Sequence, residues 1–346
     1  MLVAEHIKLI DRPDVGLKGA IVIHSTALGP AAGGCRLWRY ASQQQLVEDA
    51  MRLAEGMTYK NALAGLPFGG GKAVLQLPDA PFDRARLFAA FGEEVAALGG
   101  DYVTAEDVGT TVADMQQVRS ATRHVAGLPA AQERPGGDPS PFTARGVFAA
   151  LEVALRRHRG RSLEGARVGV QGLGNVGFAL CGLLADAGAQ LVVADPRGDA
   201  TERALARFGA EVVPVDAILT ADVDVLAPCA LGGILNTESI ERLRARVICG
   251  GANNQLGKPE DGTQLMNRNI LYAPDYVANA GGIINVAAEY LGWSGDDVEA
   301  RLAEIGPRMD AILADAAARA IPPHRAAEDA ALGIIMPSRK RRANAG

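Results

Sequence analysis

The chain has 346 residues, a formal net charge of −5 at pH 7 and 48% hydrophobic residues, so it is long enough for two domains and apolar enough for two cores. The negative charge gives no electrostatic reason to expect a nucleic-acid partner. No apolar stretch approaches the length of a membrane span, and the N-terminus lacks the pattern of a signal peptide, which together favour a cytoplasmic protein without a membrane partner.

The first region of the chain mixes short strands with helices. GAIVIHS at 19–25 predicts a buried strand, and residues 29–34 predict a loop. Ser42 and Gln45 fit a capping box that opens a helix. Lys60 then lies near the C-terminal end of that helix.

Further along, residues 82–98 predict a second amphipathic helix that ends at paired glycines. DYVTAED at 101–107 carries Asp107 out of a predicted strand. Residues 133–141 (ERPGGDPSP) are rich in proline and glycine and are therefore the best candidate linker.

After the linker, short apolar strands alternate with helices, which predicts a parallel sheet covered on both faces. The predicted strands are 167–171, 190–195, 211–215, 222–228, 246–250 and 270–274. From Asp296 onward the chain is rich in alanine, and we expect it to be helical.

GLGNVG at 172–177 follows the first of these strands and opens a helix, which is the context of a dinucleotide-binding fingerprint. Gly172 permits the tight turn, Gly174 lets a pyrophosphate approach the backbone, and Gly177 lets helix and strand pack closely. Asp195 ends the next strand, where it can accept hydrogen bonds from a ribose 2′-hydroxyl and repel a 2′-phosphate. We therefore predict NAD in preference to NADP, a preference that the nearby Arg197 weakens.

GLPFGGGK at 65–72 places Lys72 directly behind three glycines, which we interpret as clearing the approach of a substrate to the backbone. Lys60 and Lys72 lie in apolar or glycine-rich runs with no acid between them. A buried lysine that loses its charge can serve as a general base, and a charged one can bind a carboxylate. On spacing alone, Asp107 is equally well a turn residue before Gly109.

Histidines and cysteines give no sign of a metal site or of a disulfide. His24 is best explained by packing at the end of a strand, and the five histidines show no close ligand spacing. The cysteines are scattered and predict reduced, mostly buried thiols. They are Cys35, Cys181, Cys229 and Cys249.

Seven motifs in chain order resemble the amino-acid dehydrogenase family whose members act on glutamate, leucine, valine and phenylalanine. The likeness is greatest to the leucine, valine and phenylalanine members and runs from about Ile21 to Val286. The motifs are GMTYKN (56–61), GLPFGGGK (65–72), TAEDVGTT (104–111), GLGNVG (172–177), APCALGG (227–233), GGANNQ (250–255) and APDYVANAGGIINV (273–286).

The resemblance implies roles for matched positions. Lys72 would activate water, Asp107 would transfer protons to and from the substrate nitrogen, and Lys60 would bind the substrate carboxylate. Thr143 and Asn254 would lie near the nicotinamide end of the cofactor. The loop that binds NAD would comprise Gly172, Leu173, Gly174, Asn175, Val176 and Gly177, with Asp195 on the ribose.

The resemblance also implies a substrate pocket. Glutamate members hold the distal carboxylate with a lysine and a serine, and the matching positions here are Ala32 and Val286. A glutamate carboxylate would lie unpaired against apolar groups, so we expect an apolar substrate, of the branched-chain type or else phenylalanine. Ile283 would form the other wall, and Gly33 and Ala105 would complete the substrate-binding set.

The expected fold is α/β, with an N-terminal substrate and oligomerisation domain, a doubly wound Rossmann domain and a cleft between them. We place the first domain at 1–136, the NAD-binding domain at 137–320, and a C-terminal helix and tail at 321–346 that return toward the first domain. The implied activity is NAD-dependent oxidative deamination of an L-amino acid to a 2-oxo acid and ammonia by a homo-oligomer. A hydroxy-acid dehydrogenase would need a catalytic histidine, and a non-catalytic NAD-binding protein would lack Lys60, Lys72 or Asp107.

Overall fold

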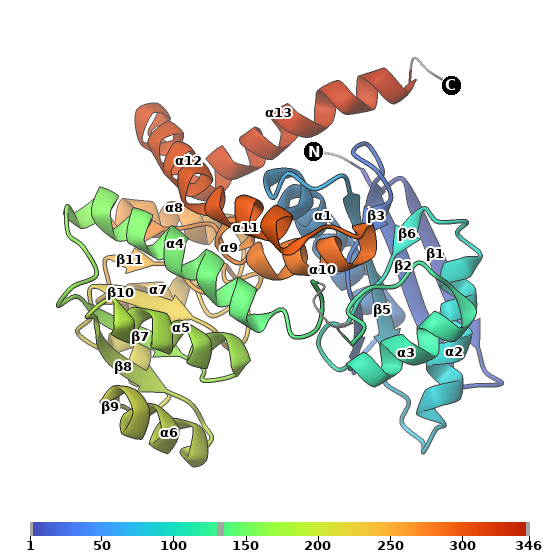
Figure 1. Cartoon of the computed structure of the whole chain (residues 1–346), viewed down its shortest axis with the longest axis horizontal. Helices are drawn as coiled ribbons and strands as arrows, with labels where there is room; N and C mark the ends of the chain where they lie inside the picture. The colour runs from blue at the N-terminus through green and yellow to red at the C-terminus, as the bar shows by residue number, and fades with distance from the viewer. Residues whose placement is uncertain (1–2, 130–134, 344–346) are drawn as a thin grey trace. The chain divides into compact units, whose positions relative to one another are not determined.

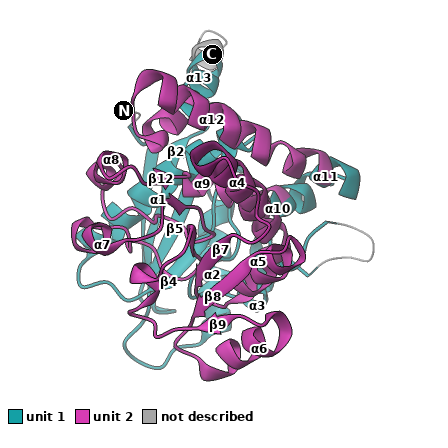
Figure 2. Cartoon of the chain, turned by 90° about the vertical axis from the view of Figure 1, so that its left-hand side faces the viewer, with its two compact units in different colours: residues 1–138, 285–298, 331–346 teal, residues 139–284, 299–330 magenta. Residues whose placement is uncertain are grey.

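The computed structural model describes residues 3–129 and 135–343 (Figure 1). The chain divides into two compact units, which Figure 2 shows in different colours. The first comprises residues 1–138, 285–298 and 331–346, and the second comprises residues 139–284 and 299–330. Residues 133 and 134 of the predicted linker lie outside the described residues. Within the described ranges, no helix combines the length and the apolar character that crossing a bilayer requires.

The first unit is built on a six-stranded mixed sheet in the order β1-β2-β5-β3-β6, with β4 also paired to β5. β2 pairs antiparallel with β1 and β5, and the remaining pairs are parallel. The strands are β1 His6–Arg12, β2 Leu17–Ser25, β3 Ala31–Ala32, β4 Cys35–Trp38, β5 Gly69–Gln76 and β6 Tyr102–Val103. The prediction of a loop over 29–34 was wrong at its centre, because β3 lies there between β5 and β6.

Three helices cover this sheet: α1 Gln43–Leu63, α2 Arg84–Ala96 and α3 Val112–Ala121. The sheet has two buried hydrophobic clusters. The apolar face of α1 packs against β2 and β5 in one of them, and α2 and α3 pack against the strands in the other. Ser42 accepts the backbone N–H of Gln45, so the predicted N-cap is confirmed, but only this half of the capping box forms. Lys60 lies in the last turn of α1, as predicted.

The glycines before Lys72 have a packing role that the sequence did not reveal. A Cβ at Gly69 would lie 1.8 Å from the Ser25 carbonyl oxygen, and one at Gly70 would lie 2.1 Å from Thr58 of α1. These glycines therefore let β2 and α1 approach β5 closely, and the close packing fixes Lys72 in the centre of the sheet. That they also clear the approach of a substrate to Lys72 stays a prediction.

The second unit contains a six-stranded parallel sheet in the order β12-β11-β10-β7-β8-β9. All six predicted strands are confirmed, most of them shorter than predicted. They are β7 Arg167–Gln171, β8 Gln190–Ala194, β9 Glu211–Val212, β10 Val225–Pro228, β11 Val247–Ile248 and β12 Leu271–Tyr272. The strand order reverses between β7 and β10, which is the topological switch point of a doubly wound sheet.

Helices connect these strands and complete the chain. α4 Ser140–Arg159 precedes the first strand, and α9 Asp275–Ala278 follows the last one. The elements between the strands are α5 Asn175–Asp186, α6 Gly198–Phe208, the 3-10 helix η1 Ile218–Thr220, α7 Thr237–Arg242 and α8 Pro259–Asn267. After α9 come α10 Gly281–Leu291, α11 Gly295–Ala303, α12 Ile305–Arg319 and α13 Pro323–Ala343. The predicted helical character beyond Asp296 is confirmed.

Candidate functional site

A buried lysine and a carboxylate meet in the first unit. Lys72 lies in β5 opposite Val22 of β2, and its Nζ is 2.8 Å from Oδ2 of Asp107. The two side chains are only 6% and 15% exposed. The sequence places these residues 35 positions apart, and the pairing of β3 with both β5 and β6 brings them together. At this distance a proton can pass directly between the two groups.

Arg36, which no sequence motif marks, shares the same carboxylate. Its Nε lies 3.3 Å from Oδ2 of Asp107, and its Nη1 lies 2.9 Å from Oδ2 of Asp49. Tyr40 donates a 2.6 Å hydrogen bond to that same oxygen of Asp49. Because Asp49 and Tyr40 hold the far side of the guanidinium, Arg36 holds Asp107 in position beside Lys72.

The environment of Asp107 favours its ionised form. Burial alone would raise the pKa of this carboxyl, but the charges of Lys72 and Arg36 and the hydrogen bond from Lys72 hold the pKa below its usual range. The loop that carries it is also fixed, since the Asp107 backbone N–H donates to the Thr110 hydroxyl. The Thr110 hydroxyl lies 2.9 Å from the carbonyl oxygens of both Cys35 and Asp107, which share its one proton.

Lys60 is half-buried in the last turn of α1, the helix that packs on β5. The next residue, Asn61, is fully buried and donates to the carbonyl oxygens of Ala32 (3.2 Å) and Gly69 (2.6 Å). These bonds tie the end of α1 to β3 and to the start of β5. The helix end that carries Lys60 is therefore fixed to the strand that carries Lys72.

The predicted substrate-binding residues of the first unit lie on or beside short strands. Ala32 is in β3 and is 5% exposed. Gly33 accepts a 2.6 Å hydrogen bond from the Tyr102 hydroxyl, and the Ala105 carbonyl accepts one from the Cys35 backbone N–H. Ile283 and Val286, the other two predicted pocket residues, are half-buried in α10.

In the second unit, the GLGNVG loop combines a tight turn with open space at the N-terminus of a helix. Gly172 has φ +90°, where a side chain is strained, and a Cβ at Gly177 would lie 2.0 Å from the Gly172 carbonyl oxygen. Around Gly174, in contrast, a Cβ would meet nothing within 4 Å. Gly174 is the N-cap of α5, so the open space lies at a helix N-terminus, which favours anions.

Three motifs meet at the carboxyl edge of the parallel sheet, around this loop. The Cys229 backbone N–H donates to the Gln171 carbonyl, and a Cβ at Gly251 would lie 2.7 Å from Val176. Asn254, which has φ 51°, accepts the backbone N–H of Gly233 through its carbonyl. The GLGNVG, APCALGG and GGANNQ motifs therefore form one surface at the switch point.

Asp195 follows β8 at the same edge and is already held by the protein. Its Oδ2 accepts the Leu173 N–H at 2.7 Å, and its Oδ1 accepts the Arg197 backbone N–H at 2.9 Å. Arg197 also forms an ion pair with it at 3.0 Å. Burial would raise the pKa of Asp195, but the hydrogen bonds from Arg197 and Leu173 hold it below its usual range. The exposed Arg197 thus places a positive charge directly beside the Asp195 carboxylate.

The remaining candidates and the minor predictions also have defined positions. Thr143 lies in the first turn of α4, where its hydroxyl donates to the Pro139 carbonyl. A Cβ at Gly282 would lie 2.5 Å from the Thr143 hydroxyl.

His24 is buried near the end of β2, with Nδ1 2.8 Å from the Thr58 hydroxyl. All four cysteines are free thiols, and three of them are buried, as predicted.

A doubly wound sheet whose switch point carries a glycine-rich loop at a helix N-terminus is the architecture of a dinucleotide-binding dehydrogenase. In this chain the loop comprises residues 172–177 and is called the glycine loop below. Residues 6–124 match the family described as "Glu/Leu/Phe/Val dehydrogenase, dimerisation domain". Residues 138–204 and 199–342 match "Glutamate/Leucine/Phenylalanine/Valine dehydrogenase". The chain therefore belongs to the Glu/Leu/Phe/Val dehydrogenase family.

Similar proteins agree with this assignment. The chain is 44% identical to a leucine dehydrogenase of Thermoactinomyces intermedius over 98% of this chain and 92% of the relative. It is 45% identical to a valine dehydrogenase of Streptomyces virginiae over 90% and 88% of the two chains. The crystal structure of L-tryptophan dehydrogenase from Nostoc punctiforme superposes with a TM-score of 0.84, at 37% identity and 98% coverage of both chains.

Proposed function

We propose that this protein catalyses the reversible, NAD-dependent oxidative deamination of an apolar L-amino acid of the leucine and valine type. The products are the corresponding 2-oxo acid and ammonia. The proposal rests chiefly on the buried Lys72–Asp107 pair. The reaction needs one group that takes a proton from water and another that exchanges protons with the substrate nitrogen, and these two side chains can supply both. The leucine and valine dehydrogenases among the relatives support the substrate class.

The assigned roles follow from the chemistry of the first unit. The carboxylate of Asp107 accepts a proton from the substrate ammonium group, while Lys60 binds the substrate carboxylate. Once Asp107 is neutral, it no longer stabilises a charge on Lys72, and a buried site favours the neutral amine. Lys72 then releases its proton to solvent and, as the neutral amine, takes a proton from the water that attacks the imine carbon. Asp107 returns its proton to the nitrogen of the resulting carbinolamine. The Asp107 carboxylate then accepts the hydroxyl proton as the C=O bond forms and ammonia leaves.

The residues of the second unit fit a bound NAD. The open space at Gly174 and the N-terminus of α5 suit the pyrophosphate, and the carboxylate of Asp195 suits the ribose hydroxyls. Bound NAD would supply the acceptor for the hydride that leaves the substrate Cα. We assign Thr143 and Asn254 to the nicotinamide end of the same site.

Asp195→Ala should weaken NAD binding and narrow the preference for NAD over NADP. The substitution removes a hydrogen-bond acceptor for the ribose and frees Arg197, which can then pair with a 2′-phosphate. Values of kcat/KM for both cofactors measure the change. The double variant Asp195→Ala/Arg197→Ala is the matched control, and its NADP activity should fall below that of the single variant. Equal kcat/KM for NAD and NADP in the native protein would show that Asp195 does not select the cofactor.

Native protein should oxidise leucine, valine or phenylalanine at least 10²-fold better than glutamate, by kcat/KM. Ala32 and Val286 offer no partner to a distal carboxylate, and burying one unpaired costs about 3 kcal/mol or more, where each 1.4 kcal/mol is tenfold. Initial rates of absorbance change at 340 nm over a panel of amino acids measure this. Glutamate as the best substrate would refute the apolar pocket.

An aromatic substrate is the second candidate. The small side chain of Ala32 supports it, as does the likeness to L-tryptophan dehydrogenase. The same panel, extended to tryptophan, decides between the two classes. If Ala32 lines the pocket, Ala32→Leu should shift the preference from aromatic toward smaller aliphatic substrates, by a steric effect of roughly 1–3 kcal/mol. If the ratio of kcat/KM for phenylalanine to that for leucine does not change, Ala32 does not line the substrate pocket.

We also propose that the protein is a homo-oligomer. The support is the dimerisation-domain family that residues 6–124 match. Sedimentation or light scattering of the native protein gives the number of chains, and a monomer would contradict the proposal.

A further inference from the structure

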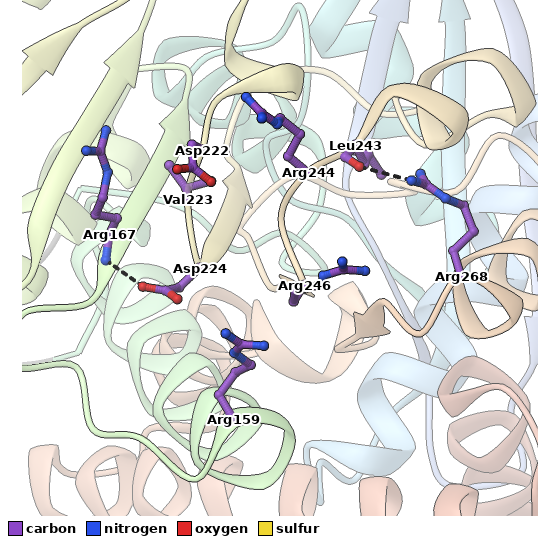
Figure 3. Close-up of a pocket in the computed structure, with 9 residues that line it drawn as sticks. All are labelled: Arg159, Arg167, Asp222, Val223, Asp224, Leu243, Arg244, Arg246 and Arg268. Carbon is purple, nitrogen blue, oxygen red and sulfur yellow. Dashed lines mark hydrogen bonds between the residues drawn. The ribbon is translucent and has the colours of Figure 1, made fainter.

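A basic cavity of about 560 Å³ lies in the second unit, away from the glycine loop (Figure 3). Its lining comes from the segments that lead into the parallel strands: Arg167 begins β7, Asp224 precedes β10, Arg246 precedes β11 and Arg268 precedes β12. The amino ends of parallel strands lie at one edge of a sheet, and the glycine loop follows the carboxyl end of β7. The two sites are therefore at opposite edges.

The charges in this cavity are strongly unbalanced. Five arginines line it against two aspartates, whereas the whole chain has a net charge of −5. The arginines are Arg159, Arg167, Arg244, Arg246 and Arg268, and the aspartates are Asp222 and Asp224.

Some of these charges are already engaged. Arg268 donates to the carbonyls of Ile240 and Leu243, and Arg167 forms a 2.9 Å ion pair with Glu211. Asp224 accepts the backbone N–H of Arg167 at 3.0 Å, drawn in Figure 3, and pairs with Arg161 at 3.2 Å.

Three guanidinium groups remain without such partners. Among the residues that the structure describes, the side chains of Arg159, Arg244 and Arg246 form no ion pair and no hydrogen bond. Like charges around one hollow repel each other. The neighbouring His158 is affected, because burial and the charges of Arg159 and Arg246 lower its pKa. A multiply charged anion would relieve this repulsion.

We propose that this cavity binds a small molecule with two or more linked phosphate groups. The planar guanidinium group of arginine can donate two parallel hydrogen bonds to the oxygens of one phosphate group. Three unpaired guanidinium groups are best neutralised by a ligand with more than one negative charge. The cavity volume lies within the 300–1,000 Å³ range of small-molecule sites and exceeds the needs of a single phosphate. A polyphosphate chain, alone or as part of a nucleotide, has both the charge and the size.

Calorimetric titration of the native protein with tripolyphosphate, at about 0.1 M salt and with saturating NAD to occupy the glycine loop, tests the proposal. We expect one site per chain and at least tenfold weaker binding in the double variant Arg244→Gln/Arg246→Gln. The control Arg86→Gln/Arg119→Gln removes the same charge from exposed positions of the first unit and should bind like the native protein. Tighter binding of ATP than of tripolyphosphate would assign the site to nucleotides, and equal binding would assign it to the phosphate chain.

Two results would overturn the proposal. One is the absence of measurable tripolyphosphate binding to the native protein. The other is equal affinity in the Arg244→Gln/Arg246→Gln variant and the native protein, which would place the binding elsewhere. Circular dichroism of both double variants confirms that they fold, since all four arginines are exposed.

Discussion

Lys72→Ala should lower kcat by a factor of roughly 10²–10⁴, the range for losing a positioned general base. The amine is buried in the centre of β5 at 2.8 Å from Asp107, and no other lysine occurs in that strand. Steady-state kinetics with leucine and NAD measure the loss. NAD binding, followed by fluorescence titration, should persist, because the glycine loop belongs to the other unit.

The matched control is Lys18→Ala, which removes an exposed lysine from the neighbouring strand β2. This variant should keep near-native kcat. Because Lys72 is buried, melting curves must show that Lys72→Ala still folds. Near-native kcat in a folded Lys72→Ala protein would show that Lys72 is not the general base.

Asp107→Asn should also lower kcat by about 10²–10⁴-fold, because the amide can neither accept nor return the substrate proton. It should destabilise the protein as well, since Lys72 and Arg36 would lose the carboxylate that they share. Steady-state kinetics and melting curves at neutral pH measure the two effects. A folded Asp107→Asn variant with native kcat would contradict the assigned proton transfer.

The stability effect has a predictable pH dependence. The pKa of Asp107 is lower in the folded protein than its ordinary value. Its ion pairs therefore stabilise the fold above the unfolded pKa of about 4, and this contribution is lost as the pH falls through the folded pKa. The difference in Tm between native protein and Asp107→Asn should be largest near pH 7 and shrink below pH 4.

The variant Arg36→Gln tests whether Arg36 tunes the pKa of Asp107 or only supports the structure around it. One of the two cations that lower the pKa of Asp107 disappears in this variant, so the acidic limb of kcat/KM against pH should move to higher pH. A purely structural role would lower the activity at every pH without moving the limb.

The parallel sheet could be predicted from sequence because its signals are local. Each of its strands is a short apolar run, and the glycines of the 172–177 loop occur at fixed spacing before a helix. The predicted strand over 167–171 is reproduced residue for residue, whereas β9 and β12 are each two residues long. The ends of such strands depend on their neighbours' hydrogen bonds, which no local pattern encodes.

The mixed sheet was harder to predict because its contacts are distant in sequence. Nothing near Arg36 signals that it meets a carboxylate 71 residues later, and that contact exists because β4 pairs with β5 beside β3. The three glycines before Lys72 could be singled out from the sequence, but the close packing that they permit could not be predicted. The close approach of Ser25 and Thr58 to β5 appears only once the strands and α1 are packed.

The products that native protein forms from L-leucine and NAD test the assignment as an amino-acid dehydrogenase most directly. We expect NADH, ammonia and 4-methyl-2-oxopentanoate in a one-to-one-to-one ratio, with absorbance at 340 nm reporting the NADH. NADH formation without ammonia, or no turnover of any apolar amino acid while a 2-hydroxy acid is oxidised, would contradict it.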